Sequence, residues 1–273
     1  MKAKQRWYMQ FVKALTALLI ISPFYLAFCY AVKTKEQISM TGLAFPTSVA
    51  WENFTMAIER TRFYETLSNT VLTTIVGTLI LTFACSMAAY VLARRKGWFY
   101  AVFSGMLTLT ILVPFHSYMF PLYLNIRAIG LNNSRAGYLL AKMGAQVGFS
   151  VIIMTGFVKS VPIQVEEATY IDGGGVFRTF FSVVVPLMKP ILMTSVIVNA
   201  LSFWNEYAIA LVFLQSDANM TLPLMQTRFF GQYSADLGQA FALFTLSMLP
   251  ILVLYFSFQR YVISGIVMGS VKG

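Results

Sequence analysis

The chain has 273 residues, of which 58% are hydrophobic and only 11% are charged. A soluble domain carries about 25% charged residues, so this composition excludes a protein whose whole surface faces water. The formal net charge of +10 is a feature of many nucleic-acid-binding proteins, but the bases stand between long apolar blocks, and we expect no nucleic acid partner.

Six apolar blocks are long enough to cross a membrane, since a spanning helix needs about 20 residues. The blocks are continuous, whereas the strands of a membrane barrel are shorter and alternate in polarity. Helices also satisfy every backbone group internally. The sequence therefore predicts an all-α, polytopic membrane protein with one domain over 1–273. The six predicted spans are 14–32, 71–93, 101–123, 138–158, 191–214 and 240–261.

The distribution of Lys and Arg predicts that both termini are cytoplasmic. With that orientation, 12 of the 20 bases fall in the inside segments and the other 8, Lys142 among them, are counted outside. The cluster Arg94-Arg95-Lys96 in a short connection strengthens the bias. Glu206 is the one acidic residue within a predicted span.

The first block is interpreted as a span rather than a cleaved signal peptide. It is longer than a normal signal core and continues into Lys33 instead of a small-residue cleavage site. The two cysteines, Cys29 and Cys85, both lie in apolar blocks, where a free thiol packs as a small hydrophobic group. The spacing of these residues predicts neither a disulfide framework nor a metal site.

Three segments are predicted on the outside. Residues 33–69 form the longest one, an ordered cap with a short helix near 51–60, and 124–137 and 215–239 form the other two.

Within the third block, Pro114 and Pro121 each lack an N–H donor. They predict a kinked helix, either as a simple bend or as a bend that shapes a translocation path.

The segment 159–190 is predicted to lie outside the membrane, because it carries Glu166, Glu167, Asp172 and Arg178. Pro162 suits the first turn of a helix, and acids near its start favour the helix dipole. The run 173–175 is Gly-Gly-Gly, which accepts the left-handed backbone that ends a helix. A second short helix is expected from about 176 to the prolines at 186 and 190.

This segment resembles the cytoplasmic EAA loop of ABC importer permeases, the binding-protein-dependent inner-membrane component. The family pattern is Glu-Ala-Ala, three residues, Gly, nine residues, then Ile-x-Leu-Pro. Here Glu167-Ala168-Thr169 is followed after three residues by Gly173, and the pattern closes on Val183-Val184-Val185-Pro186. Thr169 and the valines are mild departures.

Other regions are similar to the carbohydrate-uptake branch of that family, in particular to the smaller maltose-type permease subunit. These regions are Val113-Pro114, Pro121-Leu122-Tyr123, Phe203-Trp204-Asn205-Glu206 and the tail from Phe258 to Gly273. The lone histidine, His116, stands where that branch has a glutamine. It is interpreted as a packed or cavity-lining imidazole, with a proton relay as the alternative.

The resemblance implies a permease subunit of an ATP-driven importer for a sugar or oligosaccharide in the bacterial inner membrane. The chain contains no G-x-x-x-x-G-K-[ST] phosphate loop, so it is not expected to be an enzyme or to bind a cofactor or metal. ATP and Mg would bind to a separate ABC ATPase dimer. The other implied partners are a larger permease subunit, an extracytoplasmic solute-binding protein and membrane lipid.

The resemblance also implies site residues. The residues expected to couple to the ATPase are Glu166, Glu167, Ala168, Asp172, Gly173 and Pro186. The tail residues Ser270, Val271, Lys272 and Gly273 would contact the ATPase or form a frayed end, and the loop 215–239 would contact the binding protein or act as an ordinary connection. A helix that only anchors the bundle is the alternative for the coupling segment.

The candidates for the translocation path are Trp204, Asn205, Glu206 and Tyr207. An ionisable group within a membrane usually faces the bundle interior, so Glu206 would either face the solute or form a structural hydrogen bond to the partner permease.

Two other functions stay open on the sequence. One is a permease for a polyamine, a phosphonate or glycerol phosphate. The other is a polytopic sensor or enzyme without an ATPase, which the single histidine and the absence of paired intramembrane carboxylates disfavour.

Overall fold

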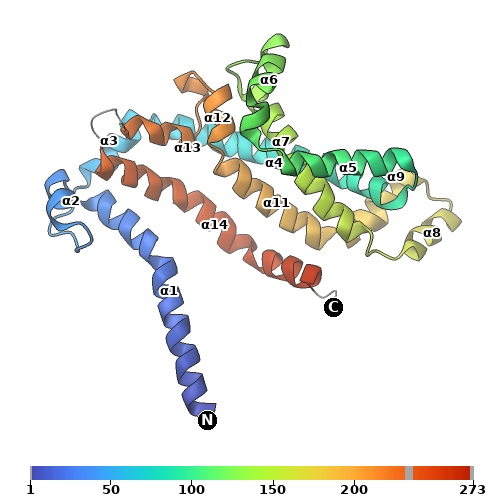
Figure 1. The fold of residues 1–273 in the computed structure, drawn as a ribbon, viewed down its shortest axis with the longest axis horizontal. Helices are drawn as coiled ribbons and strands as arrows, with labels where there is room; N and C mark the ends of the chain where they lie inside the picture. The colour runs from blue at the N-terminus through green and yellow to red at the C-terminus, as the bar shows by residue number, and fades with distance from the viewer. Residues whose placement is uncertain (1, 231–235, 271–273) are drawn as a thin grey trace. The chain divides into compact units, whose positions relative to one another are not determined.

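The computed structural model describes the backbone of residues 2–230 and 236–270, and every regular element within those ranges is a helix (Figure 1). Four helices there are long and apolar enough to cross a membrane: Arg6–Val32, Phe63–Arg94, Arg135–Val158 and Leu237–Gln259. Two bent helix pairs pass the same test together, which gives up to 6 spans. The prediction of an all-α polytopic protein is confirmed.

The chain divides into two compact units, whereas one domain over 1–273 is expected from the sequence. The first comprises Met1–Leu67 and Met225–Pro250, and the second comprises Ser68–Leu224 and Ile251–Gly273. Helices α4 (Phe63–Arg94) and α14 (Leu237–Ser270) contribute to both units.

The first unit contains α1 (Lys2–Val32), α2 (Lys35–Thr41) and α3 (Glu52–Arg60). The predicted short helix near 51–60 is therefore confirmed. The Asn53 amide donates to the carbonyls of Ala31 (3.0 Å) and Lys33 (2.9 Å), which fixes α3 against the end of α1. The Lys33 side chain is fully buried and donates to the carbonyl of Gly42 at 2.7 Å.

Asp236 joins three segments of this unit at its surface. Its carboxylate pairs with Lys35 at 2.7 Å and with Arg60 at 2.6 Å. The hydrogen bond from Lys35, followed by the one from Arg60, holds the pKa of Asp236 below its ordinary value. The Arg60 guanidinium also lies 5.2 Å from the centre of the Phe229 ring. The remaining regular elements here are the 3₁₀ helix η3 (Gln226–Phe229) and the start of α14.

The second unit is built on α4, α5 (Trp98–Leu112), α7 (Arg135–Val158) and α11 (Lys189–Trp204). Helix α5 packs along α7, and Gly148 allows this contact, since a Cβ there would overlap Leu107 and Thr110. Gly77 does the same where α4 meets Phe203 of α11. A shared apolar core includes Leu81, Cys85, Met154, Val158, Phe180, Val184 and Met188.

Polar side chains tie α4 to other segments of the second unit at three levels. Near its start, Asn69 donates to the carbonyls of Ala218 and Met220, and Thr70 accepts from the backbone N–H of Leu222. At mid-length, Thr82 accepts from Asn199 at 3.4 Å. At its end, Arg94 contacts the segment 161–166, as described below.

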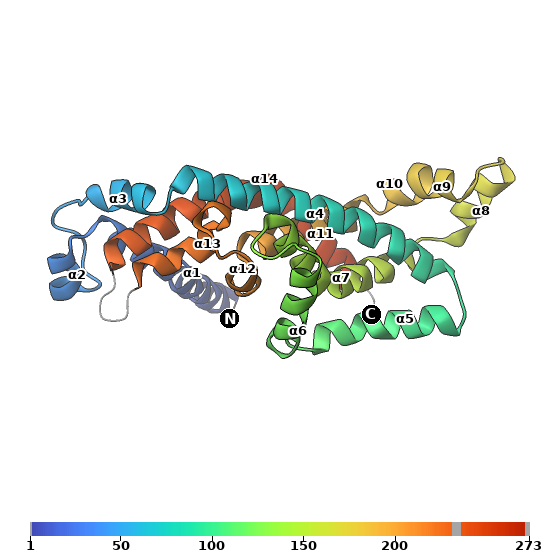
Figure 2. The ribbon, with the colours of Figure 1, turned by 90° about the horizontal axis from the view of Figure 1, so that it is seen from above.

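The third predicted span, 101–123, is not one kinked helix. It consists of α5 and α6 (Phe115–Ala128), whose axes differ by 109°. Pro114 is the N-cap of α6 in an extended conformation, and Val113 before it is also extended (ψ 116°). Proline disfavours the helical region for the residue before it, and the chain turns there (Figure 2). Pro121 lies inside α6.

The fifth predicted span, 191–214, is also divided. Helix α11 ends at Trp204, and α12 (Ala208–Phe213) follows after residues 205–207. Before α11 come α8 (Ile163–Ile171), α9 (Val176–Thr179), the π-helix η1 (Phe180–Val184) and α10 (Val185–Leu187). The segment 176–187 meets α11 at 76°. Figures 1 and 2 both place α8 and α9 at one end of the second unit, away from α12.

The remaining short elements are the 3₁₀ helix η2 (Asp217–Asn219) and α13 (Leu222–Met225). Both belong to the predicted outside loop 215–239, in which residues 231–235 lie outside the described part.

Candidate functional site

The first candidate site is the corner between α8 and α9. The N–H of Gly174 donates to the carbonyl of Thr169 at 2.8 Å, and that of Gly173 donates to Tyr170 at 3.1 Å. These two bonds form a Schellman motif, which needs a left-handed residue after the helix. Gly173 is that residue, with φ of +76°, and a Cβ on Gly174 would lie 2.7 Å from Thr169 Cγ2. The expected glycine turn is present and fixed by local bonds.

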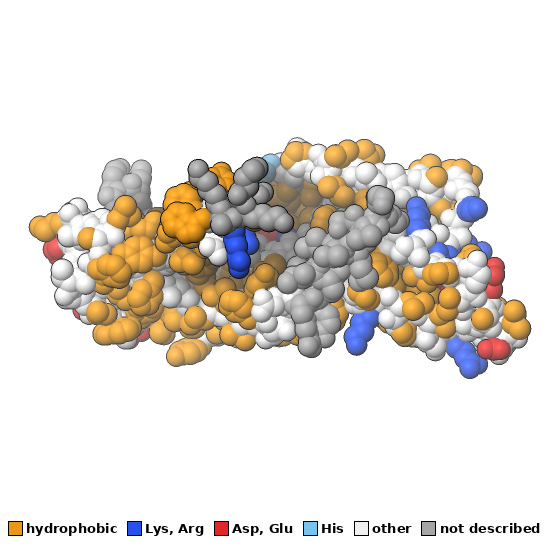
Figure 3. Space-filling model, turned by 90° about the horizontal axis from the view of Figure 1, so that it is seen from below, with side chains coloured by type: hydrophobic (Ala, Val, Ile, Leu, Met, Phe, Trp, Pro, Cys, Tyr) orange, Lys and Arg blue, Asp and Glu red, His pale blue; other side chains and the backbone are white. Residues whose placement is uncertain are grey.

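The corner presents most of the predicted coupling residues to the exterior. Glu167, Ala168, Asp172 and Gly173 are exposed. The neighbouring apolar side chains Ile171 and Phe177 are 86% and 70% exposed. Charged side chains gather at this end of the second unit in Figure 3. Pro186 is exposed on α10, directly after the π-helix.

Glu166 differs from the other coupling candidates because it is buried, with 3% exposure. Its Oε1 accepts from Arg94 Nε at 2.8 Å and its Oε2 accepts from the Tyr90 hydroxyl at 3.0 Å. Arg94 also donates to the carbonyl of Val161 at 2.9 Å. This cluster, which we call the α4–α8 joint, connects the corner to the end of α4, so Glu166 is not on the surface that a partner could touch.

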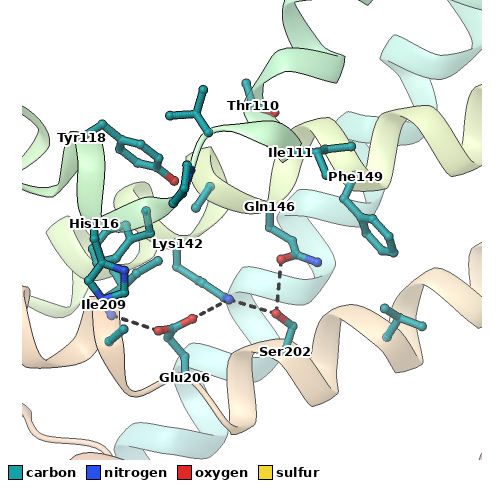
Figure 4. A pocket seen from close by; sticks show the side chains of 16 residues that line it. Thr110, Ile111, His116, Tyr118, Lys142, Gln146, Phe149, Ser202, Glu206 and Ile209 are labelled. Carbon is teal, nitrogen blue, oxygen red and sulfur yellow. Dashed lines mark hydrogen bonds and ion pairs between the residues drawn. The ribbon is translucent and has the colours of Figure 1, made fainter.

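The second candidate site is a cavity of about 560 Å³ in the second unit, between α7, the α5–α6 turn and the α11–α12 break (Figure 4). Its polar lining comes from Lys142 and Gln146 of α7 and from Ser202 and Glu206. Apolar and aromatic groups cover the rest, with His116 and Tyr118 from α6. The lining also includes Thr110, Ile111, Val113, Pro114, Phe115, Ala145, Phe149, Val198, Ala208 and Ile209.

A buried ion pair lies at the centre of this lining. Lys142 Nζ is 2.6 Å from Glu206 Oε2, and their side chains are 7% and 12% exposed. Lys142 also donates to the Ser202 hydroxyl at 2.9 Å, and that hydroxyl donates to Gln146 Oε1 at 3.2 Å. Glu206 Oε1 accepts from the N–H of Ile209 at 2.9 Å. We call Lys142 and Glu206 the cavity pair.

The structure corrects the charge count at Lys142. The predicted orientation places this base with the outside segments, but Lys142 lies two turns inside α7 and is buried. A lone base in one apolar block and a lone acid in another are a sequence signal for pairing, because charges in membranes find partners. That signal was missed, as were the roles of Gln146, Ser202 and Tyr118.

Of the four predicted path residues, only Glu206 lines the cavity. Trp204 is buried in the second unit with 6% exposure. Asn205 is exposed and donates to the carbonyl of Leu201, and Tyr207 is 41% exposed. His116, expected as a packed or cavity-lining group, is one of the lining residues.

The predicted tail falls largely outside the described residues. Helix α14 continues to Ser270, and Val271, Lys272 and Gly273 lie beyond the described part. Within the described residues, no group of His, Cys, Asp and Glu could hold a metal ion.

Comparison with known proteins identifies the family. Residues 80–267 match the binding-protein-dependent transport system inner membrane component. The chain is 34% identical to the melibiose/raffinose/stachyose import permease protein of Bacillus subtilis, covering 100% of both chains. It is 30% identical to a probable starch degradation products transport system permease protein of Thermoanaerobacterium thermosulfurigenes, covering 98% of this chain and 97% of that one.

A solved structure shares the fold. It is a bacterial ABC transporter involved in the import of the acidic polysaccharide alginate, which matches with a TM-score of 0.82 at 21% identity and covers 96% of this chain and 98% of that chain. The family match and the full-length relatives together show that this chain belongs to the binding-protein-dependent transport system inner membrane components, the permease subunits of ABC importers.

Proposed function

We propose that this chain is one of two membrane subunits of an importer for sugars or oligosaccharides, with both termini in the cytoplasm. The support for the substrate class is that relatives over the full length are named for melibiose, raffinose and stachyose and for starch degradation products. The second, larger permease, an extracytoplasmic binding protein and an ABC ATPase dimer complete the assembly. ATP and Mg bind to the ATPase, and this chain itself binds no cofactor.

The α8–α9 corner is the observation that carries this proposal. A helix of nine residues, closed by a rigid Schellman turn, projects exposed apolar and acidic side chains at one end of the second unit. Exposed large apolar groups beside charges are typical of protein interaction surfaces. We assign Glu167, Ala168, Ile171 and Asp172 to the surface that contacts the ATPase.

The α4–α8 joint connects the corner to the end of helix α4. An Arg–carboxylate pair with further hydrogen bonds is geometrically specific, and here it includes Tyr90, Arg94 and Glu166. When closure of the ATPase dimer moves α8, the joint carries that movement into α4. The spans then reorient about the central path, which is alternating access by rigid-body motion.

Cross-linking tests the contact surface directly. The native cysteines, Cys29 and Cys85, are both buried, so an introduced cysteine is the reactive one. Ile171→Cys should form a cross-link to a co-purified ATPase with a short bifunctional thiol-to-amine reagent, and ATP should change the yield. Leu109→Cys, on the exposed face of α5, is the matched control and should form none. A transporting preparation without a cross-link at position 171 would contradict the assignment.

A matched pair of glycine variants tests the corner itself. Gly173→Asp adds a negative charge to the corner at φ of +76°, a left-handed conformation that costs most L residues about 1–2 kcal/mol and Asp less. We expect it to abolish uptake and to detach or uncouple the ATPase. Gly175→Asp adds the same charge where φ is −82° and space is open, and it should retain uptake. Normal uptake by Gly173→Asp would reject the role of the corner.

A further inference from the structure

The cavity pair lies where a solute could reach it. Both side chains are mostly buried, yet both line a cavity of about 560 Å³, which is within the range of about 300–1,000 Å³ typical of small-molecule sites. We propose that this cavity is a solute subsite for a neutral, polyhydroxylated compound, and that this subunit therefore contacts the solute directly. The inference rests on the proposed function. It adds which residues contact the solute and that the solute is uncharged.

Hydrogen-bonding capacity remains in the cavity after the internal bonds are counted. The Lys142 ammonium has three N–H donors, and the described side chains Glu206 and Ser202 accept two of them. The Glu206 carboxylate offers about four acceptor positions, and Lys142 and Ile209 use two. A sugar hydroxyl both donates and accepts, so it can bind to the two members of the pair together. Bonds to charged groups are roughly twice as strong as neutral ones.

Tyr118 adds a neutral group on the opposite wall. Its hydroxyl points into the same space as Lys142 and Gln146 in Figure 4, and its ring is half-buried. Phe149, at 37% exposure, and Phe115 supply aromatic surface on the lining. An apolar lining with a few convergent polar groups is the usual composition of a ligand site, and the C–H faces of sugar rings can pack on aromatic rings.

The charge balance specifies the class of solute. Among the described lining residues the only Lys, Arg, Asp and Glu side chains are those of the cavity pair, so its fixed charges sum to zero. A uronic acid would bring its carboxylate near Glu206 without an unpaired base to receive it, and like charges placed together oppose binding. A neutral oligosaccharide has no carboxylate and is therefore not repelled by Glu206.

A purely structural role makes a different prediction. In that role the pair only joins α7 to the α11–α12 break, through Lys142, Glu206 and the N–H of Ile209. Replacing a buried ion pair with apolar residues of similar volume is often neutral for stability, whereas removing one partner is not. The double variant Lys142→Met/Glu206→Leu would then fold, assemble and transport.

The experiment uses the complete importer, with its binding protein, in proteoliposomes. The probes are radiolabelled melibiose, raffinose and maltotriose as neutral solutes and trigalacturonate as an acidic one. We expect ATP-dependent uptake of at least one neutral probe, at a rate at least tenfold above that of trigalacturonate. The double variant should assemble with the ATPase by size-exclusion chromatography but lose at least tenfold in uptake. Tyr118→Phe should lose threefold to tenfold.

Tyr123→Phe is the control for Tyr118→Phe. Tyr123 lies on the same helix, α6, but is not part of the lining. Uptake by the Tyr123→Phe importer should stay within twofold of that by the unmodified importer. Uptake of trigalacturonate that equals or exceeds every neutral probe would overturn the charge class. An assembled double variant and a Tyr118→Phe variant with normal uptake would overturn the subsite. If no probe enters in an ATP-dependent manner, the proposed function fails, and the inference fails with it.

Discussion

The α4–α8 joint and the cavity pair are two ion pairs of nearly equal length with different surroundings. The contacts measure 2.7 Å between Arg94 and Glu166 and 2.6 Å between Lys142 and Glu206. Around the joint, a tyrosine hydroxyl and a backbone carbonyl take up further hydrogen bonds. The cavity pair likewise makes further bonds, to the Ser202 hydroxyl and from the Ile209 N–H. Both pairs border open volume, about 360 Å³ beside the joint and about 560 Å³ beside the cavity pair. Both pairs join two segments, and they differ in that the larger volume lies beside the cavity pair, where a solute has more room.

The largest effect is expected from Glu166→Gln. The substitution keeps the shape but leaves Arg94, whose side chain is 15% exposed, without a carboxylate, and breaking a buried pair costs about 3–5 kcal/mol. The free energy of unfolding, measured by SDS titration in mixed micelles, should fall by that amount. Trypsin should also cleave faster after Lys159 and Arg178, on either side of α8. Unchanged cleavage at both sites would show that the joint does not hold the corner.

Glu206→Gln should cost less, about 1–3 kcal/mol, the usual penalty for an unsatisfied buried group. Lys142 keeps its bond to Ser202, and water in the cavity can solvate the ammonium. The same SDS titration makes the comparison with Glu166→Gln. If both variants lose equal stability, the larger volume beside the cavity pair does not relieve the unpaired lysine, and the distinction between the two pairs is wrong.

Tyr90→Phe removes one neutral donor from the joint and leaves its ion pair. We expect a loss of about 0.5–1.5 kcal/mol, the net value of a typical hydrogen bond. Phe180, whose ring centre is 5.4 Å from that of Tyr90, should keep the ring in place. A loss as large as that of Glu166→Gln would mean that the hydroxyl, rather than the arginine, anchors the carboxylate.

The smallest effect is expected at Asp236, whose partners Lys35 and Arg60 are 74% and 44% exposed. Exposed pairs contribute about 0–1 kcal/mol. Because the pKa of Asp236 is lowered in the folded state, this contribution is present above the ordinary aspartate pKa of about 3.9. It disappears as the pH falls through the lower folded-state pKa. The stability difference from Asp236→Asn should therefore be constant from pH 8 to 5 and shrink below about pH 4.

Local features of the fold were predictable because their causes are local. The Gly-Gly-Gly run at 173–175 determines where α8 ends, since the Schellman bonds join residues only three and five positions apart. The apolar blocks likewise predict the helices long enough to span a membrane, except that the third and fifth blocks are each divided. The helix at Glu52–Arg60 also appears as expected.

Features that depend on distant contacts were not predictable. Both prolines of the third block predicted a kink, yet Pro114 separates two helices while Pro121 lies within one. The position along the helix and the packing of α5 on α7 decide between those outcomes. Lys142 and Glu206 are 64 residues apart in sequence, so only the fold shows that they share one cavity. Burial of Glu166 depends equally on its partner at the end of α4.

The three attachments of α4 have a consequence for the order of events during transport. Asn69 and Arg94 are 25 residues apart, which corresponds to about 38 Å of helix at 1.5 Å per residue. At one end α4 is bonded to the segment 218–222, and at the other to the segment 161–166. A hydrogen-bonded helix does not shorten readily, so α4 acts as a strut. We therefore expect a displacement at one end to be transmitted to the other, so that the two ends of the second unit move together rather than in sequence.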